Sequence, residues 1–405
     1  MSGAAQSDAV EGAEALPLAG VKVVDLSHML AGPYSTWIMA ALGADVIKVE
    51  VPGRGDFTRK IGPFLQGESI YFLSINRNKR SVTLNLKHPE GKAALLRLVA
   101  DADVLLENNR PGVMARLGLD YAAVSAVNPR IVYASVSGFG QTGPYSSRPA
   151  FDAVIQAMSG TMSITGEEGR GPVRVGASIG DMAAGLFATV GILSALHSRQ
   201  HTGRGTFVDV AMFDAQLALL ENAVARFLNA GDVPRRIGSR HPLIAPFQAF
   251  PTTDEPIVVC VDTEPQWERL CGVLGREDLL KEPLFVDGNA RVNNHAVLEP
   301  ILNECFIKRS RADWLSALEK AEVPAGPINS IPDVVADPQI LARNMIAAAG
   351  GGRFVSQPIR MGDGAAQTAW PERPAPALGA DTDSVLASVG YSSEDIARLR
   401  AAGAL

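Results

Sequence analysis

Short runs of apolar residues alternate with longer amphipathic stretches along the first third of the chain. The amphipathic stretches predict helices, among them Tyr34–Leu42 and a helix that begins at Pro89, because proline is well tolerated in a first helical turn. The apolar runs have the length and composition of strands that are buried on both faces. They predict strands at Val21–Leu26, Asp45–Val49, Ser81–Leu86, Asp103–Glu107 and Arg130–Val136. The alternation indicates an α/β fold with a mostly parallel sheet.

The pattern changes after a predicted helix over Asp209–Ala230. Residues 231–250 are rich in proline, glycine and basic residues, which is typical of a linker. A strand at Pro256–Asp262 and helices at Gln266–Leu274, Asn293–Phe306 and Ser310–Ala321 then suggest a small second domain. A further helix follows Pro327, with a strand near Phe354–Met361 and a last helix at Ser393–Ala401. We expect a leader (1–16), a large α/β domain (17–229), a linker with the small α+β domain (230–328), and a return segment (329–405).

One stretch, from Arg174 to Leu196, contains a single ionisable residue after its first position, Asp181. The residues that follow are apolar around the whole circumference of a helix, which is typical of a buried helix. Two interpretations of Asp181 are open. Its carboxylate caps the helix, or it is a nucleophile for covalent acyl transfer, with helix amides near the developing oxyanion.

Composition excludes several classes of protein. The chain has 405 residues, of which 47% are hydrophobic and 20% charged, and its net charge of −6 argues against a dedicated nucleic-acid binder. Its cysteines, Cys260, Cys271 and Cys305, are too few and dispersed for a disulfide framework or a zinc site, so we expect no metal. Neither a signal peptide nor an uninterrupted membrane span is recognisable. We therefore expect a cytoplasmic protein with a disordered leader and no membrane partner.

Positive charge is concentrated between Lys48 and Arg116, where 12 Lys or Arg face 7 Asp or Glu. Either this is a solvated basic face, or it holds a phosphate-bearing ligand. The turn after the first strand, Ser27–Pro33, lacks the G-x-G-x-x-G pattern, and no P-loop is present. The sequence thus gives no support for NAD or FAD.

Several motifs, in this order, resemble the type III CoA-transferase family, which includes formyl-CoA transferase, carnitine CoA-transferase and α-methylacyl-CoA racemase. The resemblance covers about Leu16 to Leu405 and implies a Rossmann-like large domain, a small domain and an interlocked homodimer. The matching stretches are AGPYSTWIMAALGADVIKVE (31–50), NRNKRSVTLNLK (76–87), ENNRPGVMARLGLDY (107–121), SGFGQTGPY (137–145), VGASIGDMAAGL (175–186) and TGRGTFVDVAM (202–212).

The resemblance also implies the residues of the site. Asp181 matches the family's nucleophile, which carries first an acyl group as an anhydride and then CoA as a thioester. Gly138 and Phe139 match substrate-binding backbone positions, although a plain turn would also place a glycine there. Contacts to CoA, the substrate, fall on Leu30, Ala31, Asn76, Lys79, Asn108, Arg110 and Arg116. Lys79 and Arg116 are the expected phosphate partners, with exposed surface charge as the alternative.

The family contains other activities, which the residues help to separate. Racemases of the family carry a histidine where this chain has Phe151, and a phenyl ring cannot exchange a proton with an α-carbon. A non-catalytic acyl-CoA binding protein would not need Asp181. The glycine-rich loop of formyl-CoA transferase is replaced by GSRHPLIAPFQ (238–248), which argues against oxalate and formate. Four residues of the linker, Arg235, Arg236, Arg240 and His241, suggest dicarboxylate substrates with succinyl-CoA as donor, or are simply solvated.

Overall fold

The computed structural model describes residues 16–362 and 370–405, which form two units. The first unit holds the described residues up to Gly160, Val175–Val224, and those from Ala342 onward. The second holds Thr161–Arg174 and Ala225–Leu341. Compared with the predicted boundaries, residues 161–174, 225–229 and 329–341 fall in the second unit. The predicted leader, apart from Leu16, lies outside the described residues.

A six-stranded sheet forms the centre of the first unit, and all its neighbouring strands are parallel. The strands follow the order β5 (Arg80–Thr83), β2 (Asp45–Glu50), β1 (Lys22–Asp25), β6 (Val104–Glu107), β7 (Val132–Ser137) and β8 (Thr206–Ala211). Successive residues such as Val23 and Val24 belong to separate core clusters, so both faces of the sheet are covered. The predicted α/β fold with a parallel sheet is confirmed.

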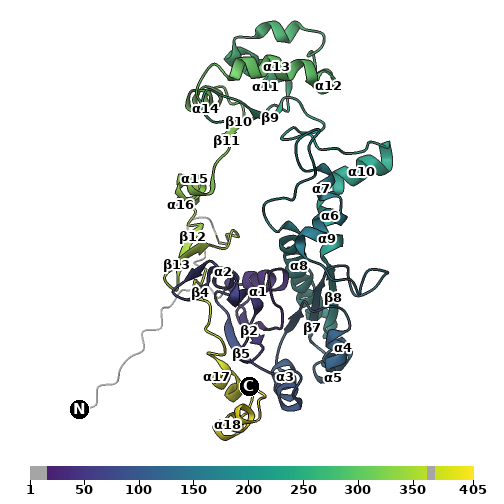
Figure 1. Cartoon of the computed structure of the whole chain (residues 1–405), viewed down its shortest axis with the longest axis vertical. Helices are drawn as coiled ribbons and strands as arrows, with labels where there is room; N and C mark the ends of the chain where they lie inside the picture. Colours follow the sequence, from purple (N-terminus) through teal and green to yellow (C-terminus); the bar gives the residue numbers. More distant parts are fainter. Residues whose placement is uncertain (1–15, 363–369) are drawn as a thin grey trace, which may run out of the picture. The chain divides into compact units, whose positions relative to one another are not determined.

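Helices and two hairpins complete the first unit (Figure 1). The helices are α1 (Ala31–Ala41), α2 (Ile70–Ile75), α3 (Pro89–Ala100), α4 (Val113–Leu117), α5 (Tyr121–Val127), α6 (Asp152–Met158), α8 (Ile179–Thr202), α9 (Met212–Leu219), α17 (Thr382–Ser388) and α18 (Ser393–Ala401), with a 3-10 turn at Phe57–Lys60. The hairpins are β3 (Phe64–Leu65) with β4 (Glu68–Ser69) and β12 (Ile346–Ala349) with β13 (Gly352–Val355). The C-terminal segment returns to the sheet, since α17 packs beside β5.

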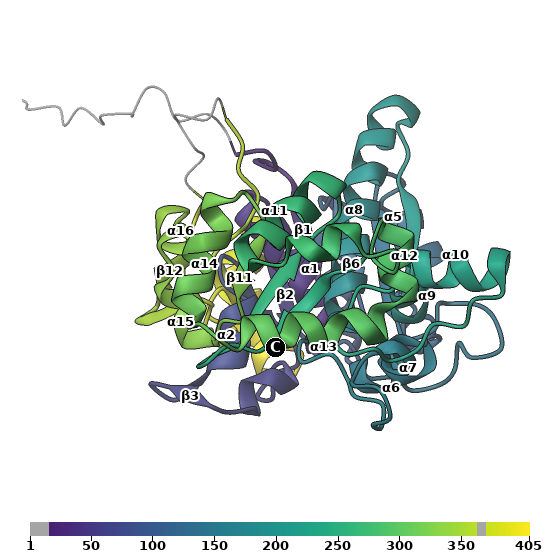
Figure 2. The same cartoon turned by 90° about the horizontal axis from the view of Figure 1, so that it is seen from above.

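The second unit combines a three-stranded antiparallel sheet with helices, as predicted for a small α+β domain. Its strands are β9 (Phe247–Phe250), β10 (Ile257–Cys260) and β11 (Ala325–Pro327). Its helices are α7 (Thr161–Ile164), α11 (Glu264–Leu274), α12 (Gly288–Asn293), α13 (His295–Phe306), α14 (Arg311–Lys320) and α15 (Ile331–Ala336), with a 3-10 turn at Glu277–Lys281. Helix α12 leads into α13 (Figure 2). Two further helices, α10 (Glu221–Ala230) and α16 (Pro338–Ala342), span the boundaries between the units.

Two of the predicted elements were wrong. The single helix expected over Asp209–Ala230 is a strand, β8, followed by α9 and α10. The run TFVDVA that forms β8 has the aromatic and β-branched composition of a strand, and β7 supplies its hydrogen-bonding partner. The strand expected near Phe354–Met361 is a hairpin that ends at Val355. Pro358 lies just beyond it and has no N–H to donate to a neighbouring strand.

Helix α8 packs against α1, α9, β7 and β8. It is not buried all round as predicted, because Leu186 and Val190 are 50% and 60% exposed. By length and composition alone, α8 is the one helix in the described part of the chain that could cross a membrane, a test that a core helix of a soluble protein also passes. Its apolar run is interrupted by Asp181, Gly185 and Gly191, as expected from the sequence.

Gly185 brings α8 close to α1. A Cβ at this position would lie 2.7 Å from the carbonyl oxygen of Ala31 and 3.1 Å from the ring of Tyr34. We expect Gly185→Ala to lower the free energy of unfolding by about 1–3 kcal/mol, because the backbone must move. Gly272, in α11, is a matched control, because a Cβ there would meet no atom within 4 Å. Gly272→Ala should gain about 0.5–1 kcal/mol in denaturant titrations. Equal effects of the two changes would contradict the close approach.

Candidate functional site

A cavity of about 1100 Å³ lies in the first unit, where the parallel strands end. Its walls come from the segments that follow β1 (Ser27, His28, Met29), β2 (Val51, Arg54, Gly55, Asp56, Phe57), β5 (Leu84, Asn85, Leu86, Lys87) and β6 (Asn109, Val113, Met114, Arg116). The crevice at the carboxyl ends of parallel strands is the usual ligand site of such sheets. The volume suffices for a large cofactor-sized ligand.

Three exposed cations line this cavity: Arg54, Lys87 and Arg116. None of their side chains forms an ion pair with another residue of the described chain, whereas Lys48 and Arg59 nearby are both paired. These three positive charges therefore face the cavity rather than being neutralised within the protein. Sequence reasoning found Arg116 but missed the other two. The signal was their position, since Lys87 follows directly on a predicted strand and Arg54 lies in the loop after another.

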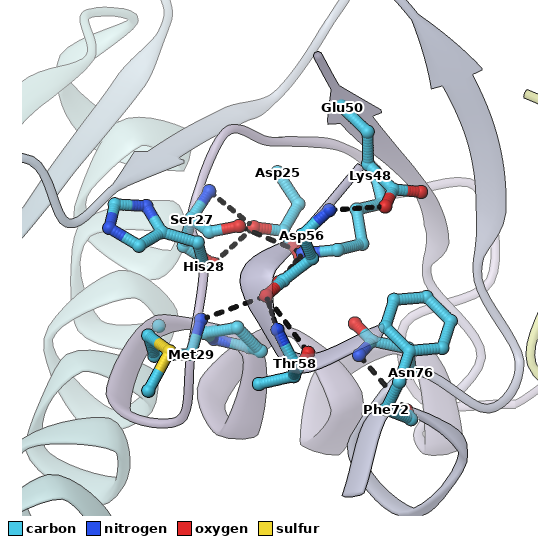
Figure 3. Close-up of polar contacts among 12 residues, drawn as sticks. Asp25, Ser27, His28, Met29, Lys48, Glu50, Asp56, Thr58, Phe72 and Asn76 are labelled. Carbon is cyan, nitrogen blue, oxygen red and sulfur yellow. Dashed lines mark hydrogen bonds and ion pairs between the residues drawn. The ribbon is translucent and has the colours of Figure 1, made fainter. Parts of the chain in front are cut away.

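A buried network of ion pairs supports the turn after β1 (Figure 3). Asp25 pairs with Lys79 at 3.0 Å, and Lys48 pairs with Asp56 at 2.9 Å. Lys48 also donates from Nζ to the carbonyl oxygen of Ser27 at 2.8 Å. All four charged side chains are inaccessible to solvent or nearly so. The network therefore acts on the backbone at the edge of the cavity.

Carboxylates of this network also bind the turn directly. Asp25 accepts the backbone N–H of Ser27 at 2.9 Å, and Asp56 accepts the N–H of Met29 at 3.3 Å. Met29 has a left-handed backbone, with φ of 66°. Residues other than glycine and asparagine rarely adopt this backbone conformation, so the surroundings of Met29 must hold it in place. The result is a fixed turn that delivers the chain into the N-terminus of α1.

Lys79, which the resemblance implied as a phosphate partner, is fully engaged within the protein. Its Nζ donates to Asp25, to the carbonyl oxygen of Pro33 at 3.1 Å and to Asn76 Oδ1 at 2.9 Å. An ammonium group has three donors, so none is left for a phosphate. Asn76 is equally engaged, because its Nδ2 donates to Phe72 O at 3.1 Å. Both side chains are buried, so the structure gives them a supporting role for the turn, and their contact with CoA stays a prediction.

Burial affects the ionisation of Lys79 as well. It lowers the pKa of this ammonium to about 8, although the carboxylate of Asp25 opposes the shift. Burial alone would raise the pKa of Asp25, but Lys79 and Lys48 together hold it well below its usual range. At neutral pH both members of the pair are charged.

The other predicted contact residues are spread around the same edge of the sheet. Leu30 is the N-cap residue of α1 and Ala31 is its first residue, so their contribution to a ligand would come from backbone groups. Asn108 holds the turn, since its amide accepts from His28 N at 2.9 Å and donates to His28 O at 2.7 Å. Arg110 is exposed. None of these four lines the cavity.

Gly138 and Phe139 follow β7 and lie outside the cavity lining. A Cβ on Gly138 would lie 2.4 Å from that of Ala150, so the close approach requires glycine. The ring of Phe139 packs against those of Tyr145 and Phe213 at 5.7 Å. The structure therefore gives this turn a packing role and leaves its substrate role as a prediction.

Asp181 is the third residue of α8, whose N-cap is Ser178, so it is not the capping residue. Burial raises the pKa of its carboxyl group to about 7, and the negative charge of Asp152 adds to the shift. Tyr71, on α2, has a pKa raised to about 12 by burial and then by Asp181, so its hydroxyl keeps its proton at neutral pH. A carboxylate with so little solvation is a stronger nucleophile than one in water. Asp181 is outside the cavity lining, whereas Phe151 is part of it.

Comparisons with known proteins agree with this arrangement. The sequence pattern of the CoA-transferase family III matches residues 18–382. Acetyl-CoA:oxalate CoA-transferase of Acetobacter aceti is 44% identical over 85% of this chain and 89% of that protein. Succinate–glutarate CoA-transferase of Agrobacterium fabrum is 39% identical over 92% and 96%. The crystal structure of a CAIB/BAIF family protein from Brucella suis matches with a TM-score of 0.83 and 40% identity, covering 93% of this chain and all of that one. The chain is therefore an enzyme that belongs to the CoA-transferase family III.

Proposed function

We propose that this enzyme moves CoA from an acyl-CoA donor to a carboxylic acid, with Asp181 as the covalent nucleophile. The observation that carries the proposal is the poorly solvated carboxylate in the first turn of α8, with a pKa of about 7. With this pKa, about half of the enzyme molecules carry an ionised Asp181 at neutral pH. The ionised carboxylate lacks the hydration that would weaken its attack on the thioester. The names of the relatives support acyl-CoA and carboxylic acids as the two substrates.

The proposed reaction is a series of acyl transfers. The Asp181 carboxylate attacks the donor thioester, the CoA thiolate leaves, and an acyl-aspartyl anhydride forms. The thiolate then attacks the aspartyl carbonyl, which releases the donor acid and leaves an aspartyl-CoA thioester. The acceptor carboxylate attacks this thioester to form a second anhydride and release the thiolate. Attack of the thiolate on the acceptor acyl carbon gives the new acyl-CoA and regenerates Asp181.

The cavity is the proposed site for CoA. The phosphates of CoA carry several negative charges. The walls of the cavity offer three unpaired cations, Arg54, Lys87 and Arg116. Guanidinium groups suit phosphate because they bind its oxygens with two parallel hydrogen bonds. The apolar part of the lining, including Met29 and Met114, suits the uncharged parts of the ligand. No step of the proposed reaction requires a metal.

We further propose dicarboxylate substrates, with succinyl-CoA as the donor. The relatives named for oxalate, succinate and glutarate act on dicarboxylic acids. Because one of them is named for oxalate, the missing glycine-rich loop does not exclude this acid. Arg236 and Arg240 are less available than expected, since Arg236 donates to Ser163 O and Arg170 O, and Arg240 pairs with Glu168 at 3.2 Å. Arg235 is exposed and stays a candidate.

Racemisation is disfavoured by Phe151. Its ring lines the cavity and is 69% exposed, so it stands at the site without any group that exchanges a proton.

A homodimer is the last part of the proposal. In the first unit, Leu186, Phe187 and Val190 of α8 and Leu217 and Leu219 of α9 are large apolar side chains that remain exposed. Apolar surface of this kind marks interaction sites. A second copy of the chain, interlocked as the family resemblance implies, would cover it.

The covalent role of Asp181 is testable with two variants. Asp181→Ala should lower kcat by about 10³ or more, which corresponds to roughly 4 kcal/mol of barrier. Asp181→Asn keeps the shape of the side chain, but an amide is a poor nucleophile. The kcat of this variant should therefore fall equally far, while circular dichroism shows a folded protein. Acyl-CoA followed by hydroxylamine should modify one peptide of the native enzyme, the one containing Asp181. Near-native transfer by Asp181→Asn would refute the mechanism.

The cations of the cavity are expected to bind CoA rather than the free acid. Arg54→Ala, Lys87→Ala or Arg116→Ala should each raise the KM for acyl-CoA about 10- to 100-fold, as the loss of a charged hydrogen bond of roughly 1.5–3 kcal/mol implies. Lys79→Ala should act mainly on stability. Arg204→Ala is the control, because Arg204 is exposed and lies outside the cavity lining. The assignment fails if Arg204→Ala raises this KM as much as the three cavity variants.

An interlocked dimer should not dissociate on dilution, because its chains cannot separate without unfolding. We expect the mass measured by mass photometry to stay at twice that of the chain at nanomolar protein. Val190→Asp, which places a charge on the exposed face of α8, should reduce the yield of dimer. Reversible dissociation of the native protein into folded monomers would argue for an ordinary side-by-side dimer or for none.

A further inference from the structure

Helix α6 holds the backbone that carries Asp181. We propose that Asp152 and Gln156 form a clamp on the segment from Val175 to Gly180, and that Asp152 is a positioning residue for Asp181. The inference rests on the proposed function only in that it takes Asp181 as the nucleophile. It adds two residues, one helical turn apart on α6, that no part of the proposed reaction uses.

The clamp consists of hydrogen bonds to both ends of the segment. Asp152 Oδ1 accepts the N–H of Gly180 at 2.8 Å, immediately before Asp181. Gln156 Oε1 accepts the N–H of Val175 at 2.8 Å, and its Nε2 donates to Asp152 Oδ2 at the same distance. One carboxylate and one amide thus hold the backbone of this segment between two fixed points.

Burial makes these bonds rigid. Asp152 is 8% exposed and Gln156 is fully buried. Gly180 fits tightly against the clamp, since a Cβ there would lie 3.1 Å from Asp152 Oδ1 and 3.5 Å from Ile155. Buried polar groups lose more when a partner is removed than exposed ones do. A side chain attached one residue after such a fixed amide has little freedom to move.

The charge of Asp152 has a second effect. Its negative charge contributes to the raised pKa of Asp181, after the larger effect of burial. Other titratable side chains stand on the elements around Asp181: Tyr71 on α2, Tyr34 on α1, Tyr133 on β7, Asp209 on β8 and Asp214 on α9. The three tyrosines keep their protons at neutral pH, because burial raises the pKa of each of them. Among the described residues, the charge that acts on the pKa of Asp181 is that of Asp152, on α6.

The test separates position from charge. Asp152→Asn keeps an oxygen for the Gly180 N–H but removes the charge, so the acid limb of the kcat/KM profile for acyl-CoA should move to lower pH. Gln156→Ala keeps the charge and removes the acceptor for Val175. It should therefore lower the plateau rate at least tenfold and leave the acid limb in place. Asp214→Asn is the matched control, because Asp214 is an exposed acid in the first turn of α9.

Stability measurements test the same clamp without activity. A folded-state pKa of about 7 for Asp181, above the unfolded value, means that its charge costs stability once it ionises. Asp181→Asn should therefore raise Tm at pH 8 but much less at pH 5. This gain should be smaller in the Asp152→Asn background, because the repulsion is already gone. The measurement stands even if the enzyme shows no CoA transfer.

Two results would overturn the proposal. The first is that Asp152→Asn changes neither the acid limb of the kcat/KM profile nor the gain in Tm from Asp181→Asn. Asp152 would then be structural only. The other is an unchanged plateau rate in Gln156→Ala. If Asp152→Asn does not fold, as judged by circular dichroism, Gln156→Ala decides the positioning role alone.

Discussion

The buried pairs between Asp25 and Lys79 and between Lys48 and Asp56 are the constraint on which the edge of the sheet depends. Burial of four charges is costly, and such pairs add little to stability compared with apolar residues of equal size. Removal of one partner is far more damaging, about 3–5 kcal/mol, because it leaves an isolated charge in the interior. The pairs are therefore better understood as devices of specificity. They hold the turn from Ser27 to Met29 in a conformation that the backbone would not otherwise choose.

The same constraint sorts the cations of the region by function. Lys48, Lys79 and Arg59 satisfy carboxylates within the protein, which leaves Arg54, Lys87 and Arg116 to face the cavity. The distinction is one of burial and not of charge or residue type. A lysine next to a strand end is thus a ligand contact or a structural support, depending on whether a buried acid stands opposite. In this chain the buried carboxylate of Asp25 lies opposite Lys79 and pairs with it.

Most of the architecture was predictable because it depends on local pattern. Apolar runs placed five of the six strands of the parallel sheet, and Asp181 was identifiable as a single charge in an apolar stretch. The edge strand β8 was missed although TFVDVA has the composition of a strand, because it runs directly into α9 and its partner β7 is distant in sequence. The supporting contacts of Lys79 were also not foreseen, since its pairing with Asp25 joins residues 54 positions apart. Arg54 and Lys87 were missed because a cavity is a property of several loops at once.

The region around Asp181, the proposed nucleophile, follows a related logic, with the sign of the electrostatic effect reversed. In the turn after β1, opposite charges are brought together so that the backbone is fixed. At α8, two carboxylates are brought near each other, and the fold accepts the cost of keeping Asp181 poorly solvated. Functional groups are often held at such unfavourable positions, because the stability lost there becomes reactivity. The hydrogen bond from Gly180 N–H to Asp152 opposes this cost. It anchors the start of α8 against the repulsion between the carboxylates of Asp152 and Asp181.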